Sequence, residues 1–300
     1  MAIKTVRAQV NGTWYTLTLN SSTKKYEASI TAPTTSSYNQ PNHYYNVTVE
    51  ATNTAGTTVS ANGATLTGLQ LVVKEKTAPI ITITAPTAGS TLTNNKPTIT
   101  WTVTDADSGV NPSTISIKID SGSVITSGIT KTASGKGYTC SYAPTTALTD
   151  GSHTITVNAS DYDGNAATAK SVTFKVDTTP PTLSVSSPAA GLITNTAALT
   201  VSGTTNDATS SPVTVKITLN GADQGTVTVA SSGAFSKAVT LKEGSNTIVV
   251  TATDAVGKAS TITRTVTLDT SAPKITAATI TPNPADVGAT VLISVTIAEE

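Results

Sequence analysis

The sequence predicts an all-β protein built from several small β-sandwiches in tandem, arranged as an elongated rod. Threonine supplies 64 of the 300 residues, and the branched side chains of threonine, valine and isoleucine suit a pleated strand. Apolar residues recur at every second position in many segments, as in strands with one buried face. Charged residues make up only 12% of the chain, about half the roughly 25% of an ordinary globular protein, so long surface helices and coiled coils are not expected.

The charge balance and the absence of long apolar segments exclude several classes of protein. Lys plus Arg and Asp plus Glu number 18 each, which leaves no basic surplus to neutralise the phosphates of a nucleic acid. No apolar run of signal-peptide or membrane-spanning length occurs, so neither export by a leader nor membrane insertion is expected. The single cysteine, Cys140, rules out an intramolecular disulfide, and its alternation with Tyr138 and Tyr142 predicts a buried, inert side chain.

A strand followed by a turn recurs three times with the same internal spacing. In each copy apolar residues alternate, an Asn or Asp follows, and a glycine closes the turn: the copies are Val47–Gly56, Ile155–Gly164 and Ile248–Gly257. The alternation predicts a half-buried strand, and the glycine suits a turn that needs positive φ. Self-similarity of this kind indicates repeated structural units.

Proline breaks divide the chain into four parts. After the second and third copies a further strand leads to Asp177–Pro181 and Asp269–Pro273, while the break after the first copy is the looser Lys74–Pro79. Proline cannot donate to a strand ladder, so these segments are expected to be linkers. The predicted parts are a divergent N-terminal β-sandwich at 1–75, complete modules at 76–177 and 178–270, and a partial module at 271–300. The last part either adds its strands to a partner or belongs to a module that is cut short.

Turn and strand motifs recur within the two complete modules. They are Asp105–Val110, Asp150–Val157 and Asp161–Asn165 in one module, and Gly203–Thr205, Val213–Gly221, Gly244–Ile248 and Thr253–Lys258 in the other. On these motifs the two modules, about two-thirds of the chain, resemble bacterial immunoglobulin-like (Ig-like) domains. The resemblance implies tandem Ig-like sandwiches, which are carried by bacterial surface adhesins, by accessory regions of polysaccharide enzymes and by virion proteins of tailed bacteriophages.

The start at Met1, without a leader or anchor, favours the phage setting among these three. The sequence therefore predicts a structural or decorating protein of a virion tail or capsid, assembled in the host cytoplasm and present in multiple copies. For such modules the resemblance implies a weak, multivalent contact with a host surface or a glycan. Two alternatives stay open: a stalk fragment of an adhesin at the bacterial cell surface, and a carbohydrate-binding accessory region.

No arrangement of residues typical of catalysis is found in the sequence. The only histidines are His43 and His153, and no metalloprotease, nucleophile-elbow or phosphate-cradle motif occurs. His153 lies in phase with inward residues, where Tyr45 and Asn246 stand in the other copies, so all three are expected to have structural roles. We predict that the protein is not an enzyme.

Acidic residues are the best chemical candidates. In an immunoglobulin topology the loop after the second strand and the last hairpin loop lie at the end where the incoming linker arrives. That end gathers Glu75, Asp105, Asp107, Asp161 and Asp163 in the middle module, and Asp177, Asp207 and Asp254 in the next. Because Ca²⁺ binds several hard oxygen ligands, these residues predict calcium at the interdomain joints, where an ion would stiffen the rod. The alternative is that aspartate stands there because it caps turns. No other cofactor is expected.

Half of the twelve aromatic residues lie in the first quarter of the chain. Adjacent residues on a strand face opposite ways, so one of Trp14 and Tyr15 is expected to point outward, and Tyr38 and Tyr44 are further candidates for an exposed face. Exposed rings with polar tips suit a protein interface or a glycan-binding face. Trp101 alternates with apolar residues and is assigned to a core. We expect the N-terminal module to dock onto other virion proteins, with the repeated modules projecting outward.

Overall fold

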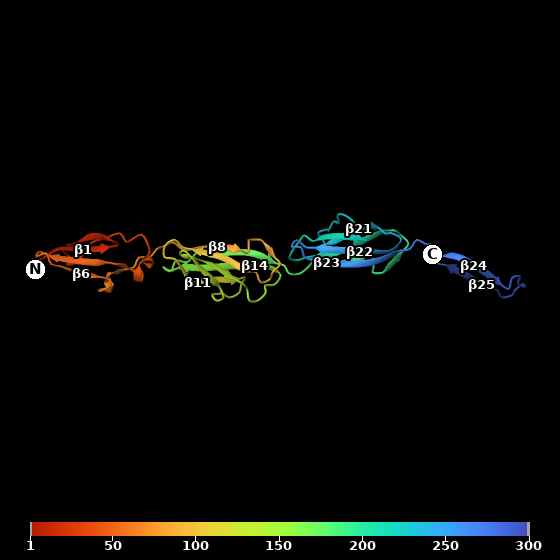
Figure 1. Ribbon diagram of the computed structural model, residues 1–300, viewed down its shortest axis with the longest axis horizontal. Helices are drawn as coiled ribbons and strands as arrows, with labels where there is room; N and C mark the ends of the chain where they lie inside the picture. Colours follow the sequence, from red (N-terminus) through yellow and green to blue (C-terminus); the bar gives the residue numbers. More distant parts are fainter. Residues whose placement is uncertain (1, 299–300) are drawn as a thin grey trace. The chain divides into compact units, whose positions relative to one another are not determined.

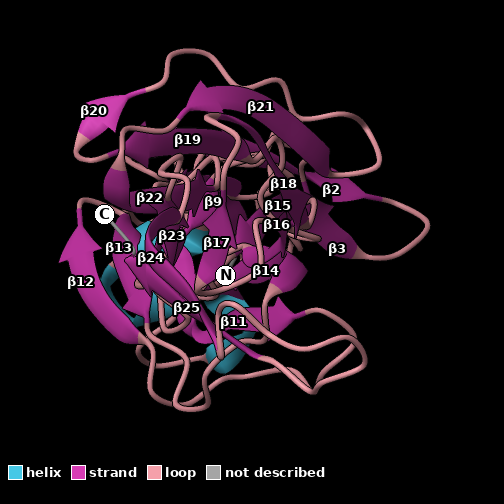
Figure 2. Cartoon of the chain, turned by 90° about the vertical axis from the view of Figure 1, so that its right-hand side faces the viewer, coloured by secondary structure: helices cyan, strands magenta, loops and turns pink. Residues whose placement is uncertain are grey.

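The computed structural model describes residues 2–298, and these residues are almost entirely β (Figure 2). Their helical part consists of three short 3-10 turns: η1 (Ser37–Asn39), η2 (Pro41–His43) and η3 (Thr67–Leu69). The chain divides into two compact units, unit 1 up to Val176 and unit 2 from Asp177 onward. The prediction of an all-β chain of tandem sandwiches is confirmed.

The N-terminal module is a five-stranded antiparallel sheet with a much smaller second sheet. The larger sheet has the order β3-β2-β1-β5-β6, and the smaller pairs β4 with β7 (Figure 1). The strands are β1 (Ile3–Val10), β2 (Thr13–Asn20), β3 (Lys25–Glu27), β4 (Tyr45–Asn46), β5 (Thr48–Asn53), β6 (Thr58–Asn62) and β7 (Gln70–Leu71). Asn11 and Gly12 join β1 to β2 with φ of 49° and 82°, the left-handed geometry that an Asn-Gly hairpin turn favours.

The core of this module is small. Between residues 2 and 75 the buried apolar side chains are Val6, Val10 and Tyr45. The Tyr45 hydroxyl donates to the Thr35 carbonyl at 3.1 Å, which is a structural role of the kind expected for it. Because the second sheet has only two short strands, much of the inner face of the first sheet is left partly open.

The middle domain is a sandwich of two four-stranded sheets. The sheets have the orders β12-β13-β10-β8 and β11-β14-β15-β9. The strands are β8 (Ile80–Ala85), β9 (Thr91–Leu92), β10 (Ile99–Thr104), β11 (Val110–Ile119), β12 (Thr130–Ser134), β13 (Gly137–Tyr142), β14 (Gly151–Asp161) and β15 (Lys170–Val176). The first strand starts in one sheet as β8, and the short β9 then pairs in parallel with β15 in the other. This order matches the two sheets of an immunoglobulin fold.

The third domain has a related topology in unit 2, with three strands in one sheet and five in the other. Its sheets have the orders β16-β18-β21 and β17-β23-β22-β19-β20, and β17 again pairs in parallel with the last strand, β23. The strands are β16 (Thr182–Ser187), β17 (Leu192–Thr194), β18 (Ala198–Asn206), β19 (Thr214–Leu219), β20 (Ala222–Asp223), β21 (Ala234–Thr240), β22 (Gly244–Thr253) and β23 (Ala259–Leu268). The repeat seen in the sequence is therefore a repeat of one sandwich.

Each sandwich has a continuous apolar core made by the alternating inward residues. In the middle domain Trp101, Ile115 and Phe174 are fully buried, and in the third domain Ile217 and Ile248 are. Burial alternates along the strands: in β10, Ile99, Trp101 and Val103 are buried, and the threonines between them are half-buried. The assignment of Trp101 to a core is confirmed.

Beyond the third domain the described chain forms a hairpin of β24 (Lys274–Thr281) and β25 (Leu292–Ala298) (Figure 1). Every residue of β24 is exposed, and so are apolar residues of β25 such as Leu292 and Ile293. The two strands pair with each other but bury neither face.

Candidate functional site

Two groups of three carboxylates occupy equivalent positions in the two Ig-like domains. The unit-1 cluster consists of Glu75, Asp105 and Asp161, and the unit-2 cluster of Asp177, Asp207 and Asp254; in each, one oxygen per residue lies within 4.8 Å of the other two. The first member of each precedes the first strand of its sandwich, the second follows β10 or β18, and the third stands at the end of β14 or β22. Six of the eight predicted acidic residues are thus brought together.

The other two predicted acidic residues, Asp107 and Asp163, lie outside the unit-1 cluster and hold backbone and side-chain donors of the N-terminal module and its linker. Asp107 accepts the Ser36 amide at 2.7 Å and the Asn39 side-chain amide at 2.5 Å. Asp163 accepts the Glu75 amide at 3.0 Å. These contacts lie within unit 1. They connect Asp107 to the N-terminal module and Asp163 to the linker that follows it.

In the unit-1 cluster a side-chain amide occupies part of the space between the carboxylates. Asn165 Nδ2 donates to Asp161 Oδ2 at 2.7 Å and to the Glu75 carbonyl at 3.2 Å. Asp105 Oδ1 accepts two backbone amides of its own loop at 2.9 and 2.7 Å, whereas its Oδ2 is buried without a partner among residues 2–298. Glu75 Oε1 accepts the Ser108 amide at 2.5 Å.

The unit-2 cluster is more deeply buried and less well paired. Asp177 is 0% exposed and Asp254 is 6% exposed. Asp254 Oδ1 accepts the amides two and four residues later at 2.9 Å each, and Asp207 Oδ1 accepts those two and three residues later at 2.8 and 2.7 Å. Asp177 Oδ1 accepts a long 3.4 Å hydrogen bond from the Thr179 amide. Oδ2 of Asp177 and Oδ2 of Asp254 have no partner among the described residues.

The pKa of Asp177 is raised above its ordinary value. The main cause is burial, and the second is repulsion by Asp207, with a smaller contribution from Asp254; the Thr179 amide and the nearby Ser210 side chain act in the opposite direction. Because the folded state holds this proton more tightly, the group stabilises folding at acid pH, and that contribution is lost as the pH rises through the raised pKa. The ionised form of Asp177 is therefore held in the fold at a cost in free energy.

Two serines at the clusters were missed by reasoning from the sequence. Ser108 and Ser210 are 7% and 4% exposed. The Ser108 hydroxyl has no hydrogen-bond partner among residues 2–298, and the Ser210 hydroxyl acts on Asp177. The signal was present, because Ser108 and Ser210 are 102 positions apart, the same offset that relates Asp105 to Asp207. Serine in a threonine-rich and serine-rich chain carries too little information by itself to be singled out.

The predicted aromatic residues have different surroundings. Trp14 is 37% exposed and is covered on one face by the Arg7 guanidinium, 4.1 Å from the ring centroid. Tyr38 is half-buried because it stacks on His43 and on Tyr162 of the middle domain, with ring centroids at 4.2 and 4.6 Å. Tyr38 thus contributes to packing within unit 1, and Trp14 remains the most accessible of the predicted rings with a face for a partner.

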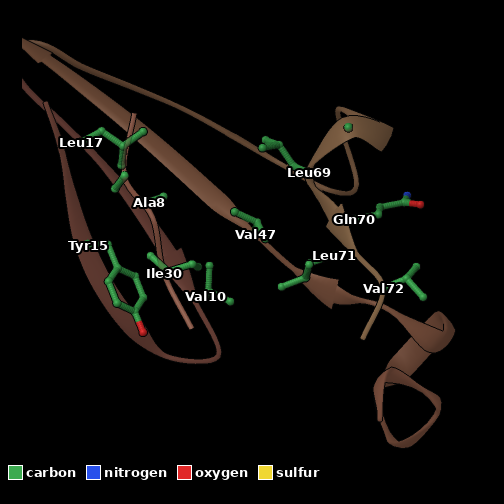
Figure 3. A pocket seen from close by; sticks show the side chains of 12 residues that line it. Ala8, Val10, Tyr15, Leu17, Ile30, Val47, Leu69, Gln70, Leu71 and Val72 are labelled. Carbon is green, nitrogen blue, oxygen red and sulfur yellow. The ribbon is translucent and has the colours of Figure 1, made fainter. Parts of the chain in front are cut away.

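Tyr15 and the open inner face of the N-terminal module line an apolar groove of about 310 Å³. In Figure 3 Tyr15, Val10 and Ile30 lie together on one side, and Leu71 projects toward them from the opposite segment. Trp14 and Tyr15 therefore face opposite sides of β2, as the alternation predicts. Tyr44 is half-buried and lies outside this lining.

The histidines and the cysteine have structural surroundings. His153 Nδ1 lies 2.8 Å from Asp120 Oδ2 and Nε2 lies 2.7 Å from the Thr149 carbonyl. Burial lowers the pKa of His153, but these hydrogen bonds outweigh it and hold the pKa above its ordinary value. Burial raises the pKa of the Cys140 thiol to about 11, although nearby Lys131 opposes the rise, so this thiol is protonated and inert at neutral pH.

Comparison with protein families agrees with the topology of both sandwiches. Residues 79–157 match the bacterial Ig domain family, and residues 181–270 match domain B of glucodextranase. The protein is built from tandem Ig-like domains. Such tandems are typical of surface and adhesion proteins. The Ig-like fold suggests a non-catalytic structural protein.

Solved structures with similar chains include three multidomain examples. The fibronectin type III-like modules of Clostridium thermocellum CbhA are 18% identical, with 63% of this chain and 94% of that chain covered and a TM-score of 0.32. A tetra-tandem repeat from the extending region of a large adhesion protein is 20% identical, with 98% and 79% covered and a TM-score of 0.36. Immunoglobulin domains 1–5 of Sidekick-1 are 13% identical, with 99% and 60% covered and a TM-score of 0.42.

No curated protein matches the sequence. In residues 2–298 no helix has the length and apolar character needed to cross a membrane.

Proposed function

We propose that this protein is a non-enzymatic structural or decorating component of a bacteriophage virion, in the tail or the capsid. The observation that carries the proposal is the tandem of Ig-like sandwiches, whose outer faces are polar and rich in threonine and serine. Threonine and serine hydroxyls pair across exposed strands, as between Thr154 and Thr173 at 3.0 Å and between Thr156 and Ser171 at 2.8 Å. Such faces suit a spacer that is displayed in water and makes only weak contacts.

The N-terminal module and the C-terminal hairpin are the proposed attachment points to other virion proteins. The N-terminal module carries the apolar groove and the accessible Trp14. The hairpin exposes both faces, with Ile275 and Ile293 at 66% and 63% exposure. Either surface gains from burial against a partner, because removing apolar area from water stabilises an interface. In this arrangement the protein is present in multiple copies, and the two Ig-like domains contact a host surface or glycan.

Immunogold electron microscopy tests the proposal. Antibodies against the full chain are applied to particles and to intact bacteria from cultures that carry the gene, with a culture lacking the gene as the control. Regularly placed gold on the particles is the expected result. Gold on the cell surface and none on the particles would replace the virion role by that of a bacterial adhesin stalk, which is the second candidate because tandem Ig-like domains are typical of surface and adhesion proteins.

The alternative of a carbohydrate-binding accessory region is tested separately on a glycan array. If Trp14 stacks on a sugar, Trp14→Ala removes the signal, whereas Tyr26→Ala, in the short strand β3 of the same sheet, leaves it intact. Binding that survives Trp14→Ala would remove this residue from the glycan site. An array without any signal would leave Trp14 a role in protein contacts and would count against the carbohydrate-binding accessory region.

A further inference from the structure

We propose that the unit-2 cluster of Asp177, Asp207 and Asp254 is a binding site for a divalent cation, and that Ca²⁺ is the ion it prefers. The proposal is independent of the virion role, since it concerns the interior of unit 2 alone.

Two buried carboxylate oxygens of the cluster have no hydrogen-bond donor in the described part of the chain. Nearly all buried polar atoms in folded proteins have a hydrogen-bond partner, yet Asp177 Oδ2 and Asp254 Oδ2 have none among the described residues. Oδ1 of each residue accepts backbone amides of its own turn, which leaves Oδ2 as the oxygen available to the cluster. Two carboxylate oxygens buried in one place without a donor are explained by a cation that they share.

The negative charge of the unit-2 cluster is not compensated by any described ion pair. Among residues 2–298 three ion pairs occur, and none of them involves Asp177, Asp207 or Asp254. Up to three negative charges thus lie within a few ångströms of one another with no side-chain cation paired to them, and burial strengthens their repulsion. A divalent cation would offset both the repulsion and the burial.

The donor set favours Ca²⁺ over Mg²⁺. The three carboxylates come from three separate loops, and the buried Ser210 hydroxyl, which acts on Asp177, is a further oxygen beside them. An irregular set of hard oxygens, completed by water or backbone carbonyls, suits the larger and flexible coordination of Ca²⁺, whereas Mg²⁺ requires a near-ideal octahedron.

The unit-1 cluster supplies an internal contrast. There the Asn165 side-chain amide donates to Asp161 Oδ2, which is the oxygen equivalent to the unpaired Oδ2 of Asp254. The position that corresponds to Asn165 in unit 2 is Lys258, which contacts Asp254 through its backbone amide and carbonyl and, in the described contacts, not through its side chain. In unit 1 the Asn165 side-chain amide therefore donates to the Asp161 oxygen, whereas in unit 2 the equivalent Asp254 oxygen is available to an ion. The unit-2 cluster is for this reason the stronger cation site.

Isothermal titration calorimetry of the full chain with calcium chloride is the direct test. One site is expected, and Asp177→Asn or Asp254→Asn should weaken its affinity about tenfold or more, because fewer charged ligands remain. Asp223→Asn is the matched control: it removes one carboxylate from the same unit, but this one is 54% exposed and paired with Lys216. The control should bind calcium as the wild type does.

Thermal melting distinguishes an ion site from turn capping. In a chelator Asp177→Asn should melt at or above the wild-type temperature, because a buried repulsion is removed; in calcium it should melt below, because the wild type gains about 10 °C at a hundredfold excess over Kd. Asparagine keeps the Oδ1 acceptor, so a pure capping role would give the same difference in both buffers.

The two tryptophans assign the site. Trp14 and Trp101 both lie in unit 1, so tryptophan fluorescence follows unit 1, while calorimetry follows both units. Calcium should raise the melting temperature of the unit-2 transition, which calorimetry records and tryptophan fluorescence does not. Three results would each overturn the proposal: no heat and no shift up to about 10 mM Ca²⁺, wild-type binding in both Asn variants, or a shift confined to the fluorescence transition. Equal affinity for Mg²⁺ would overturn the calcium preference.

Discussion

The two Ig-like domains fill the same part of their cores from opposite strands. In the middle domain Trp101 of β10 stands across from the small Cys140 of β13. In the third domain the order is reversed, since Gly203 of β18 pairs with Phe235 of β21. A Cβ added at Gly203 would lie 2.7 Å from Phe235 Cζ and would collide with the Ser184 carbonyl. Core packing therefore constrains the summed side-chain volume of a cross-strand pair more than it constrains the size of the side chain at either position.

The largest expected effect on stability comes from removing the Trp101 side chain from the core of the middle domain. Trp101→Ala should destabilise unit 1 by about 3–5 kcal/mol, because the ring is fully buried and its removal leaves a cavity. Phe235→Ala should do the same to unit 2 by a similar amount. Urea unfolding followed by circular dichroism measures both. The double variant Trp101→Gly with Cys140→Phe copies the third domain and should recover part of the loss relative to Trp101→Gly alone; no recovery would refute the shared-volume account.

A smaller effect is expected from adding one methyl group at the glycine of this pair. Gly203→Ala should destabilise unit 2 by about 1–3 kcal/mol through overpacking against Phe235 and the neighbouring strand. Thr204→Ala, whose side chain is exposed, should change stability by less than about 0.5 kcal/mol and is the control. Calorimetry of both variants checks the prediction, which fails if the two unfold alike.

The amide that separates the two carboxylate clusters gives a third test. Asn165→Ala removes hydrogen bonds to Asp161 and to the Glu75 carbonyl and should cost about 1–2 kcal/mol in a chelator. Calcium should then restore part of this stability, seen as a shift of the tryptophan transition that the wild type lacks. The reciprocal Lys258→Asn should weaken calcium binding in unit 2. If Asn165→Ala gains no calcium response, the amide is not what distinguishes the clusters.

The smallest expected effect on stability concerns a side-chain pair at equivalent positions of the two domains. The pair is ionisable in the middle domain and neutral in the third. Asp120 and His153 pair in the middle domain, while Asn220 Nδ2 donates to Asn246 Oδ1 at 3.0 Å in the third. Asp120 and Asn220 share a φ of 51°. Only the doubly protonated imidazole can donate both to the Asp120 carboxylate and to the Thr149 carbonyl, which agrees with the raised pKa of His153.

This pair should make the stability of unit 1 depend on pH. The contribution of His153 is fully present below its unfolded-state pKa of about 6.5 and is lost as the pH rises through the raised folded-state pKa. The change should be less than about 1 kcal/mol, since Asp120 is partly exposed. Urea unfolding followed by tryptophan fluorescence measures it, and Asp120→Asn with His153→Asn should abolish the dependence. A double variant with the wild-type pH profile would assign the dependence to another group.

Local patterns predicted most of the fold. The apolar alternation around Trp101, Ile155 and Ile248 predicted buried strand faces, because side chains on a strand alternate between two sides whatever lies around them. The spacing shared by Gly164 and Gly257 predicted two copies of one module. The offset between Asp105 and Asp207 also predicted that acidic residues meet at one end of each sandwich, since the order of Ig strands brings the same loops together.

The carboxylate clusters were less predictable in detail. Neither spacing nor composition distinguished Asp107 and Asp163, which hold Ser36 and Glu75, from the six acids of the clusters. The loop geometry that turns one carboxylate toward a backbone amide and another toward its neighbours is set by contacts between distant segments. The same holds for Tyr38, whose stacking on Tyr162 joins residues far apart in the sequence.

The sequence by itself determined the strand content, the number of repeated sandwiches and the residues that turn inward, because these depend on side-chain periodicity and turn chemistry within short segments. Only the tertiary structure decided which strand fills the core at Trp101 or Phe235, which carboxylates gather, and that Asn165 satisfies one cluster while the unit-2 cluster keeps unpaired oxygens. These outcomes depend on how side chains from separate strands share a fixed volume and a few donors, and that competition is resolved only when the sheets are packed.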